Sequence, residues 1–417
     1  MSTRRSILKA TVAMAALAAI GGTAGAAFAQ DKKPIEVGLI APMSGPWARQ
    51  GNLMLLGARL AIKDINENGG IKALDGRPLK LVEFDAGDSA EKAKNAAQRM
   101  VSQYPDLVAV TGAWLSSFTL AVSEVTERAK LPMVTLSYSD QITNRGFKYI
   151  FQLPLTGTQQ ADKSIPALME VAKKATGTQP KTVGIVADNT ASSESFAKPM
   201  RDGDLAKKLN LDLVTDQTFT PPLADATSLI QKVRVARPDF LEVLGTSVPD
   251  DKLIIEKINE FGLGNGRMPI ISSGAHMGAP ELLKNVGPDL MNGVMTVVGN
   301  WGAKGQEKII DRFKEATGEP WMTQDSISAY GDIQLFAYAL EKAGKADREA
   351  VADAIRNTDI ESATEGPAQY YPGNGIKFDD RGRNTRADLI IVQWQDGEPK
   401  PIYPESSALA TPVWPKH

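Results

Sequence analysis

The chain of 417 residues contains no cysteine and only two histidines, His276 and His417. Without cysteine there is no disulfide, no thiolate metal site, no cysteine nucleophile and no lipid-modified cysteine. Metal catalysis needs clustered histidines and carboxylates, and the spacing of Asp379 and Asp380 from Asp88 is not a metal-ligand pattern. We therefore expect no metal and no cofactor.

Motifs for nucleophilic catalysis are also missing. No Gly-x-Ser-x-Gly elbow occurs in the chain. A hydrolase relay would have to pair His276 with a serine from elsewhere, and a lone loop histidine is more often a polar surface or pocket group. The sequence therefore predicts a protein that is not an enzyme.

No stretch after residue 29 approaches the 18 apolar residues of a membrane-spanning helix. The first 29 residues are typical of a cleaved export signal. Arg4, Arg5 and Lys9 give it a positive start, and residues 10–24 form its apolar run. Residues 27–29 fit a small-x-small cleavage sequence. Residues 3–9 also resemble a twin-arginine motif, and both twin-arginine and Sec export stay open. We expect a mature protein in the periplasm, with no segment inserted in the membrane.

The mature chain is mildly acidic. Removing residues 1–29 takes away three positive charges, so the net charge moves from -2 to -5 over 388 residues. Basic residues such as Lys92, Lys94 and Arg99 are scattered rather than gathered into a stripe, and no nucleic-acid partner is expected. A chain of this length exceeds the usual size of a single core, which predicts two domains.

Short β-branched runs alternate with longer amphipathic runs from residue 34 onward. The first half predicts strands at 35–40, 79–84, 107–111 and 132–136, and helices at about 51–66, 90–103 and 117–130. After a turn-rich segment at 153–162, the second half predicts a helix to 174, strands at 182–187, 211–219, 240–245 and 269–272, and helices at 193–209, 225–236 and 250–261. This order predicts two α/β units with mainly parallel sheets covered by helices on both faces.

The tail after residue 298 is too short for a third domain. It predicts helices at about 306–317, 326–342 and 347–357 and a late strand at 389–394. The tail must therefore complete the two units before it. A chain that crosses more than once between two lobes leaves a cleft with hinge strands, where small ligands are usually buried.

Three linked motifs open the mature chain: VGLIAPMSGP at 37–46, GARLAIKDIN at 57–66 and GGI at 69–71. Further motifs follow at 112–117, 143–149 and 328–332. In this order they resemble the leucine/isoleucine/valine-binding proteins and the related amide- and aromatic-acid-binding receptors of ABC importers. The resemblance covers nearly the whole mature chain.

The resemblance implies an α/β fold of two Rossmann-like parallel-sheet lobes joined by a three-crossover hinge, the type I periplasmic binding protein fold. Lobe 1 would comprise residues 34–152 and 298–389, and lobe 2 residues 153–297 and 390–417. The implied function is capture of a small-molecule solute by hinge closure, for the membrane permease and ATPase of an ABC importer. A sensor that presents its ligand to a separate signalling partner stays open as an alternative.

Ligands of such folds bind beyond the carboxyl ends of parallel strands. The predicted ligand-binding residues are Trp47, Gln50, Ser116, Ser117, Ser137, Tyr138, Ser139, Ser192 and Ser247. Ser116 and Ser117 precede a helix whose N–H groups can hold a carboxylate, although ordinary N-capping is the alternative. The resemblance aligns the family's carboxylate-binding serine with Ser116. Trp47 and Tyr138 are expected to wall an apolar group, and Trp114 is open between pocket and core.

The second lobe departs from the pattern of amino-acid-binding members. Ser192 and Ser193 replace a Tyr-Gly pair, and Ser247 lies near another tyrosine position. Gly274 and Ala275 lie where a glutamate is expected. Gln50 replaces an aromatic residue. An ammonium group desolvated without an anion is costly. Either an acid such as Asp140, Asp188 or Asp250 substitutes, or the solute lacks the ammonium group. A branched-chain amino acid, an aromatic acid and an amide therefore all stay open.

Overall fold

A computed structural model of the protein describes residues 32–414. The predicted export signal lies outside these residues. From Pro34 onward the contacts of the chain form a single unit, which contains two large β-sheets and a small two-stranded one.

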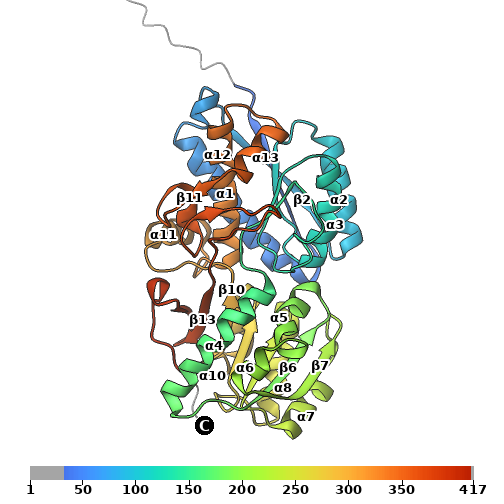
Figure 1. Cartoon of the computed structure of the whole chain (residues 1–417), viewed down its shortest axis with the longest axis vertical. Coiled ribbons are helices and arrows are strands. Elements are labelled where there is room, and N and C mark those ends of the chain that lie inside the picture. The colour runs from blue at the N-terminus through green and yellow to red at the C-terminus, as the bar shows by residue number, and fades with distance from the viewer. Residues whose placement is uncertain (1–31, 415–417) are drawn as a thin grey trace, which may run out of the picture. The chain divides into compact units, whose positions relative to one another are not determined.

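The first sheet has five parallel strands in the order β2-β1-β3-β4-β5. In chain order, β1 to β5 are Ile35–Ala41, Leu79–Asp85, Ala109–Gly112, Met133–Thr135 and Ile150–Gln152. The connecting helices are α1 (Ala48–Glu67), α2 (Ala90–Gln103) and α3 (Ser116–Arg128). Figure 1 shows α2 and α3 on one side of this sheet, and α1 beside α12 (Gln324–Ala343) on the other.

The local sequence explains these helices. The Ser89 side chain caps α2 by accepting the Lys92 N–H, and Ala93, Ala97 and Met100 form its buried stripe. In α1, a side chain at Gly57 would lie 2.0 Å from the Ser326 carbonyl oxygen. Glycine at this position therefore lets the backbones of α1 and α12 pack directly against each other.

The second sheet has seven strands in the order β14-β13-β10-β9-β8-β6-β7. The strands β6 to β10, β13 and β14 are Thr182–Asp188, Asp212–Phe219, Phe240–Leu244, Ile270–Ser273, Met295–Val298, Ile390–Gln395 and Glu398–Tyr403. Only the pairings of β13, with β10 and with β14, are antiparallel. The predicted mainly parallel arrangement is therefore confirmed.

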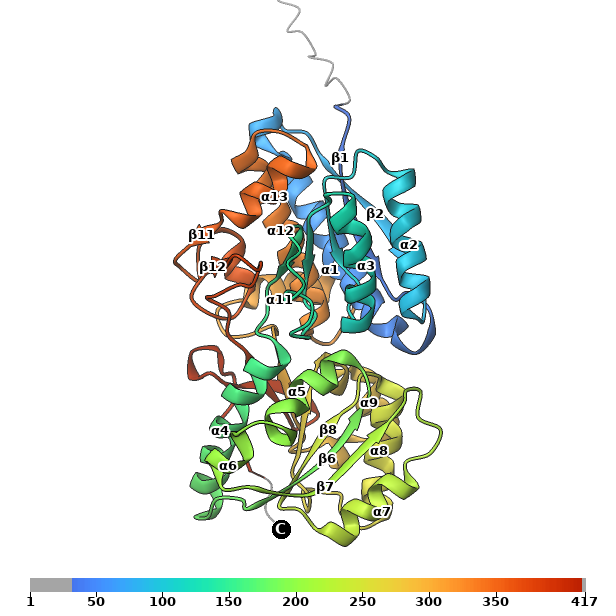
Figure 2. The ribbon, with the colours of Figure 1, turned by 45° about the vertical axis from the view of Figure 1, so that its right-hand side comes forward.

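Helices cover both faces of the second sheet (Figure 2). One apolar cluster joins the sheet to α4 (Gly157–Thr176), α5 (Ala191–Arg201) and α6 (Leu205–Leu209). The other joins it to α7 (Thr227–Ala236), α8 (Val248–Glu260), α9 (Pro280–Val286) and α10 (Pro288–Met291).

The tail serves both halves of the molecule. Helices α11 (Glu307–Thr317), α12 and α13 (Arg348–Arg356) contribute Phe313, Phe336 and Ile355 to the first core. The short strands β11 (Asp359–Ile360) and β12 (Ile376–Lys377) pair with each other, and β13 then joins the second sheet. The chain thus passes three times between the two sheets and their cores.

Two predictions of secondary structure were wrong in detail. The single helix expected at 193–209 is divided into α5 and α6, where the chain turns after Pro199 at residues 202–204. The strands β5, β10 and β14 were not predicted. Strand β14 is an edge strand that contains Pro399 and Pro401, which lack the N–H donors of a central strand.

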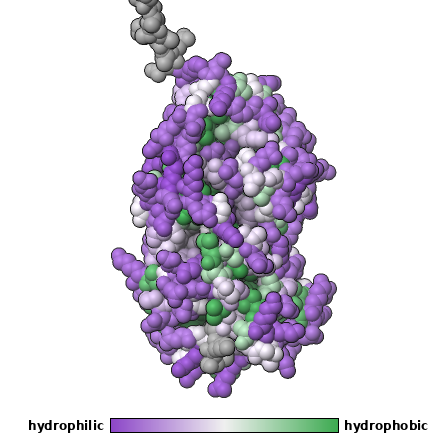
Figure 3. Space-filling view, turned by 90° about the vertical axis from the view of Figure 1, so that its left-hand side faces the viewer, coloured by the Kyte–Doolittle hydropathy of each residue, from purple (hydrophilic) through white to green (hydrophobic). Residues whose placement is uncertain are grey.

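Within residues 32–414, no helix is both long and apolar enough to cross a bilayer. The face drawn in Figure 3 is mostly hydrophilic, and its hydrophobic residues gather mainly in the lower half. The large hydrophobic side chains classed as exposed are Val214, Val235, Leu409 and Val413.

One acidic side chain lies in the middle of the second sheet. Glu242 of β8 is fully buried, and neither of its carboxyl oxygens has a hydrogen-bond partner among the described residues. Burial raises the pKa of Glu242 to about 8. The side chain is therefore protonated in the native protein at neutral pH.

We predict that Glu242→Gln stabilises the protein, and does so more at pH 8.5 than at pH 5.5. Because burial raises the folded-state pKa of Glu242, the native state loses stability as the pH rises from the pKa of the unfolded chain through about 8. The loss is up to roughly 5 kcal/mol. Glutamine mimics the protonated acid and removes this loss. Thermal unfolding at both pH values measures the gain in stability of Glu242→Gln. Glu315→Gln on the exposed side of α11 is the control. Equal effects of the two variants would contradict the assignment.

Candidate functional site

A cavity lies where strands of both sheets end. Loops and helix starts on the side of the first sheet contribute Trp114, Leu115, Ser116, Leu136, Ser137, Tyr138 and Gln324. The side of the second sheet contributes Ser192, Ser193, Thr246, Ser273, Gly274, Ala275 and His276. The space between them, open solvent included, is about 420 Å³. Most of these residues follow the carboxyl ends of parallel strands, as ligand sites of α/β folds do.

The turn from β3 into α3 is strained. Gly112, Ala113 and Trp114 have φ values of 123°, 59° and 57°, and the Leu115 N–H donates to the Ala113 carbonyl at 2.7 Å. A positive φ at a residue other than glycine costs on the order of 1 kcal/mol or more. The Trp114 indole N–H donates to the buried Asp325 carboxylate at 2.8 Å and holds the turn in place. The turn thereby directs Trp114 and the start of α3 to the cavity.

Ser116 presents a hydrogen-bond donor to the cavity. Its hydroxyl oxygen accepts the backbone N–H groups of Tyr138 at 3.2 Å and Ser139 at 3.1 Å. With both lone pairs occupied, the hydroxyl hydrogen is left to donate. No side chain caps the first turn of α3, so the helix N–H groups add to the donors for an anion.

Tyr138 contributes its ring, because its hydroxyl is engaged elsewhere. The hydroxyl donates to the Gln324 side-chain oxygen and accepts the Gly299 N–H at 2.9 Å. The same Gln324 oxygen accepts the Gly299 N–H at 2.8 Å. Burial raises the pKa of Tyr138, so its hydroxyl stays neutral. These bonds tie the cavity wall to the crossover after β10.

On the second wall, the Thr246 hydroxyl donates to the Asp188 carboxylate at 2.6 Å. The other oxygen of Asp188 accepts the Thr190 N–H at 2.9 Å. Ser192 and Ser193 stand at the start of α5, whose first turn no side chain caps. This wall therefore combines a fixed hydroxyl at Thr246 with two serines on an uncapped helix.

His276 is committed to its own lobe. Its Nδ1 lies 2.5 Å from Asp251 Oδ2, and its Nε2 lies 2.9 Å from the Ser273 carbonyl oxygen. Burial lowers the pKa of His276, but the charge and hydrogen bond of Asp251, with the Ser273 carbonyl, outweigh burial and raise it. Burial also raises the pKa of Asp251, so the two groups share a proton across the 2.5 Å contact, and the net charge of the pair is zero.

No aspartate or glutamate lines the cavity. Asp188, Asp250 and Asp251 lie behind the second wall, where they interact electrostatically with His276. On the first side, burial raises the pKa of Asp325 to about 7. Within residues 32–414, no three His, Asp or Glu side chains are grouped to hold a metal ion.

The nine predicted ligand-binding residues divide into two groups. Those that line the cavity are Ser116, Ser137, Tyr138 and Ser192. Trp47, Gln50, Ser117, Ser139 and Ser247 do not line it. Their ligand-binding role stays a prediction, and the structure gives most of them other contacts.

These contacts are local. Trp47 packs edge-on against Phe118, with ring centroids 5.6 Å apart. Ser247 caps α8 by accepting the Asp250 N–H, and Ser139 accepts the Gln141 N–H. Even Ser137, which lines the cavity, donates its hydroxyl to the Trp114 carbonyl at 2.8 Å. Gln50 is fully buried, and its side-chain amide has no partner among the described residues.

Residues 34–399 match the family described as "Periplasmic binding protein". The chain belongs to this family. Periplasmic binding proteins are solute-binding receptors and not enzymes, in agreement with the sequence-based prediction. The His276 nitrogens face Asp251 and the Ser273 carbonyl rather than a serine hydroxyl, so the structure shows no hydrolase relay at this residue.

Relatives of this periplasmic binding protein include the Leu/Ile/Val-binding protein homolog 8 of Brucella suis, which is 27% identical over 92% of this chain and 94% of its own. Among solved structures, LivJ of Streptococcus pneumoniae in complex with isoleucine has a TM-score of 0.74, with 20% identity over 88% of this chain and 98% of that chain. A solute-binding protein of R. palustris in complex with benzoate has a TM-score of 0.73, with 16% identity over 92% and 100%. The expected type I fold is confirmed.

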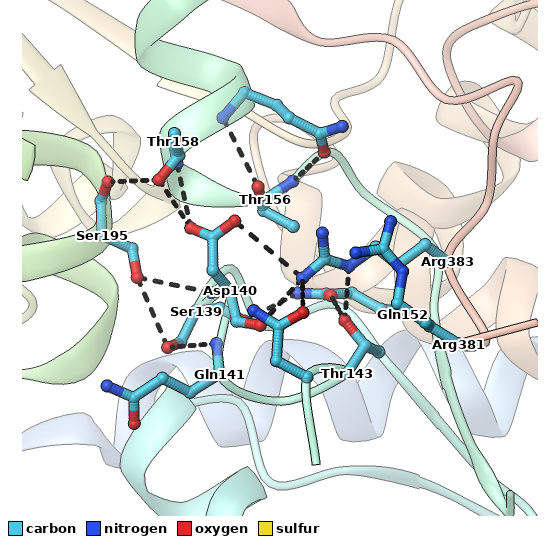
Figure 4. Close-up of polar contacts among 12 residues, drawn as sticks. Ser139, Asp140, Gln141, Thr143, Gln152, Thr156, Thr158, Ser195, Arg381 and Arg383 are labelled. Atoms are coloured by element: carbon cyan, nitrogen blue, oxygen red, sulfur yellow. Dashed lines mark hydrogen bonds and ion pairs between the residues drawn. The ribbon is translucent and has the colours of Figure 1, made fainter. Parts of the chain in front are cut away.

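A polar network connects the cavity wall of this periplasmic binding protein to its crossovers (Figure 4). The Asp140 carboxylate accepts the Thr158 hydroxyl at 2.7 Å, and the Asp140 carbonyl accepts an Arg383 N–H at 2.8 Å. Gln152 donates to the Ser137 carbonyl at 2.8 Å. Asp140 is therefore engaged at the crossovers and does not line the cavity, although its charge was one of the predicted partners for an ammonium group.

Sequence reasoning missed several lining residues of the binding protein. Thr246 had a readable signal, because it follows the buried strand β8 directly. Gln324 had none, since the tail brings it to the cavity from almost 200 residues beyond Tyr138. Gly274 and His276 were noted only as a missing glutamate and a lone histidine.

We predict that Gly274→Ala destabilises the protein by more than Gly287→Ala. Both glycines adopt backbone angles that residues with side chains avoid. Gly274 has φ 114° and ψ 156°, and Gly287 has φ 84° and ψ 161°. Only at Gly274 would the new methyl group meet His276 Nε2, at 2.6 Å, whereas Gly287 has open space. Each variant has roughly 1–3 kcal/mol of strain, and Gly274→Ala also disturbs the His276–Asp251 pair. Urea unfolding measures the free energy of unfolding of both variants. Equal losses would contradict the claim that Gly274 leaves room for the His276 ring.

Proposed function

We propose that this protein is a periplasmic receptor that binds a small carboxylate-bearing solute in the cavity and delivers it to the permease and ATPase of an ABC importer. The observation that carries the proposal is the donor arrangement at Ser116. Its hydroxyl hydrogen and the uncapped first turn of α3 converge on a cavity without acidic side chains. Hydrogen bonds from such donors to a carboxylate are charge-assisted and strong.

The rest of the cavity favours a short apolar body on the solute. Trp114, Leu115, Leu136 and Tyr138 supply aromatic and aliphatic surface beside Ser116. The ligands of the two solved structures named above, isoleucine and benzoate, both combine a carboxylate with an apolar body. We therefore propose a branched-chain amino acid or an aromatic acid as the class of solute.

We further propose that the solute is captured by hinge closure between lobe 1 (34–152 and 298–389) and lobe 2 (153–297 and 390–417). Besides the shared cavity and the Asp140–Thr158 bond, side-chain contacts at Arg49 and Trp321 link these lobes. Arg49 forms an ion pair with Glu281 of α9 across the lobes at 2.8 Å, and Glu319 of its own lobe pairs with it at 2.6 Å. The Trp321 indole N–H donates to the Gly278 carbonyl at 3.0 Å. A solute that bridges the walls would add to these contacts and shift the equilibrium toward the closed form.

Export fits this function. The predicted signal at residues 1–29, with its twin-arginine-like segment, would carry the receptor to the periplasm, where solutes enter from outside.

We predict that Ser116→Ala lowers the affinity for a carboxylate solute by at least about 10- to 100-fold and leaves the overall fold intact. One hydrogen bond to a charged group accounts for that factor, and loss of the two bonds that position Tyr138 and Ser139 adds to it. Isothermal titration calorimetry with leucine and with benzoate measures the change. Ser117→Ala is the matched control, because its neighbouring hydroxyl does not line the cavity. Unchanged binding by Ser116→Ala would remove this residue from the site.

A further inference from the structure

The hydroxyl of Thr246 has a fixed direction. Its hydrogen is donated to Asp188 at 2.6 Å, and Asp188 is in turn fixed by the Thr190 N–H. All three residues are at least nine-tenths buried. A hydroxyl that has given its hydrogen to a carboxylate offers only lone pairs to its other neighbours. Toward the cavity, Thr246 is therefore an acceptor.

Ser116 has the opposite polarity. Its oxygen accepts two backbone N–H groups, and its hydrogen is left for the cavity. The cavity thus has a donor from lobe 1 and an acceptor from lobe 2, each set by hydrogen bonds to other groups of the protein. His276 does not alter this polarity, because both of its nitrogens are engaged with Asp251 and Ser273.

The negative charge behind the second wall favours the same kind of group as Thr246, a hydrogen-bond donor. The His276–Asp251 pair is neutral as a unit, so the Asp188 carboxylate behind Thr246 is not balanced by it. A second carboxylate on the solute would meet this negative charge and the lone pairs of Thr246 together. A hydroxyl or an ammonium group would instead donate to Thr246 and be favoured by the charge of Asp188.

We infer that Thr246 selects solutes that carry, in addition to a carboxylate, a group that donates a hydrogen bond, and that Asp188 is the positioning residue that sets this preference. The inference rests on the proposed function, since it takes the carboxylate to be at Ser116. It extends that function by naming the second group of the solute, a hydroxyl or an ammonium, and the residue that recognises it.

The test uses pairs of acids that differ in the donor group: leucine with 4-methylpentanoate, and 4-hydroxybenzoate with benzoate. Calorimetry on the purified protein gives the affinity ratio within each pair. In at least one pair we expect the donor-bearing acid to bind about tenfold more tightly, the value of one hydrogen bond. The leucine pair tests an ammonium group, and the hydroxybenzoate pair tests a hydroxyl.

Three variants separate recognition from a structural role. Thr246→Val keeps the shape of the side chain and should bring the 4-hydroxybenzoate ratio to about one by weakening only the donor-bearing acid. The leucine ratio should fall but stay above one, because the charge of Asp188 remains. Thr246→Ser should restore the ratio. Asp188→Asn should lower it below one, because the new amide can accept the Thr190 N–H through its oxygen and donate to Thr246, which frees the threonine hydrogen for the cavity. Circular dichroism checks the fold of each variant.

The outcomes distinguish the two proposals. If none of the four acids binds, the proposed function fails, and this inference fails with it. If acids bind but both members of each pair bind equally well, only the polarity inference is overturned. A ratio that is unchanged in folded Thr246→Val, in the pair that shows one in the native protein, would also overturn it.

Discussion

The site depends on the hydrogen bonds that the Ser116 oxygen accepts from the backbone of Tyr138 and Ser139. These two bonds join the loop after β3 to the loop after β4, so they fix both the first wall and the direction of the free hydroxyl hydrogen. The strained turn at Ala113 and Trp114 brings Ser116 to this position. Strain of this kind persists where surrounding contacts over-determine the backbone, and the Trp114–Asp325 bond is such a contact.

The second wall follows a different principle, in which buried charges are placed behind the cavity rather than in it. Asp251 is paired with His276, and Asp188 is satisfied by Thr190 and Thr246. The carboxylates therefore act on the cavity through Thr246 and the His276 ring. This explains how the second lobe differs from the pattern of amino-acid-binding members, which the sequence indicated through Gly274 and Ala275, and still retains a polarity that a solute can recognise.

The sequence was sufficient for the α/β class, the doubled unit and most helices, because buried strands and amphipathic helices leave strong periodic signals. It also indicated Ser116 and Tyr138, which line the cavity within a few residues of the ends of β3 and β4, and their role in binding stays a prediction. It could not show that the Ser137 hydroxyl donates to the Trp114 carbonyl or that Ser247 caps α8. A serine near a strand end has the same sequence pattern whether it binds a ligand or stabilises the fold. Gln324 reaches the cavity through tertiary contacts that no local pattern encodes, whereas His276 lies just after β9 and was noted only as a lone histidine.

Small-angle X-ray scattering tests the central claim, capture between two lobes, most directly. The account predicts that the radius of gyration of the purified protein falls when it is saturated with an acid that binds by calorimetry, such as leucine or 4-hydroxybenzoate, because the solute stabilises the contacts of both walls. Scattering curves that superimpose with and without a saturating acid would contradict it.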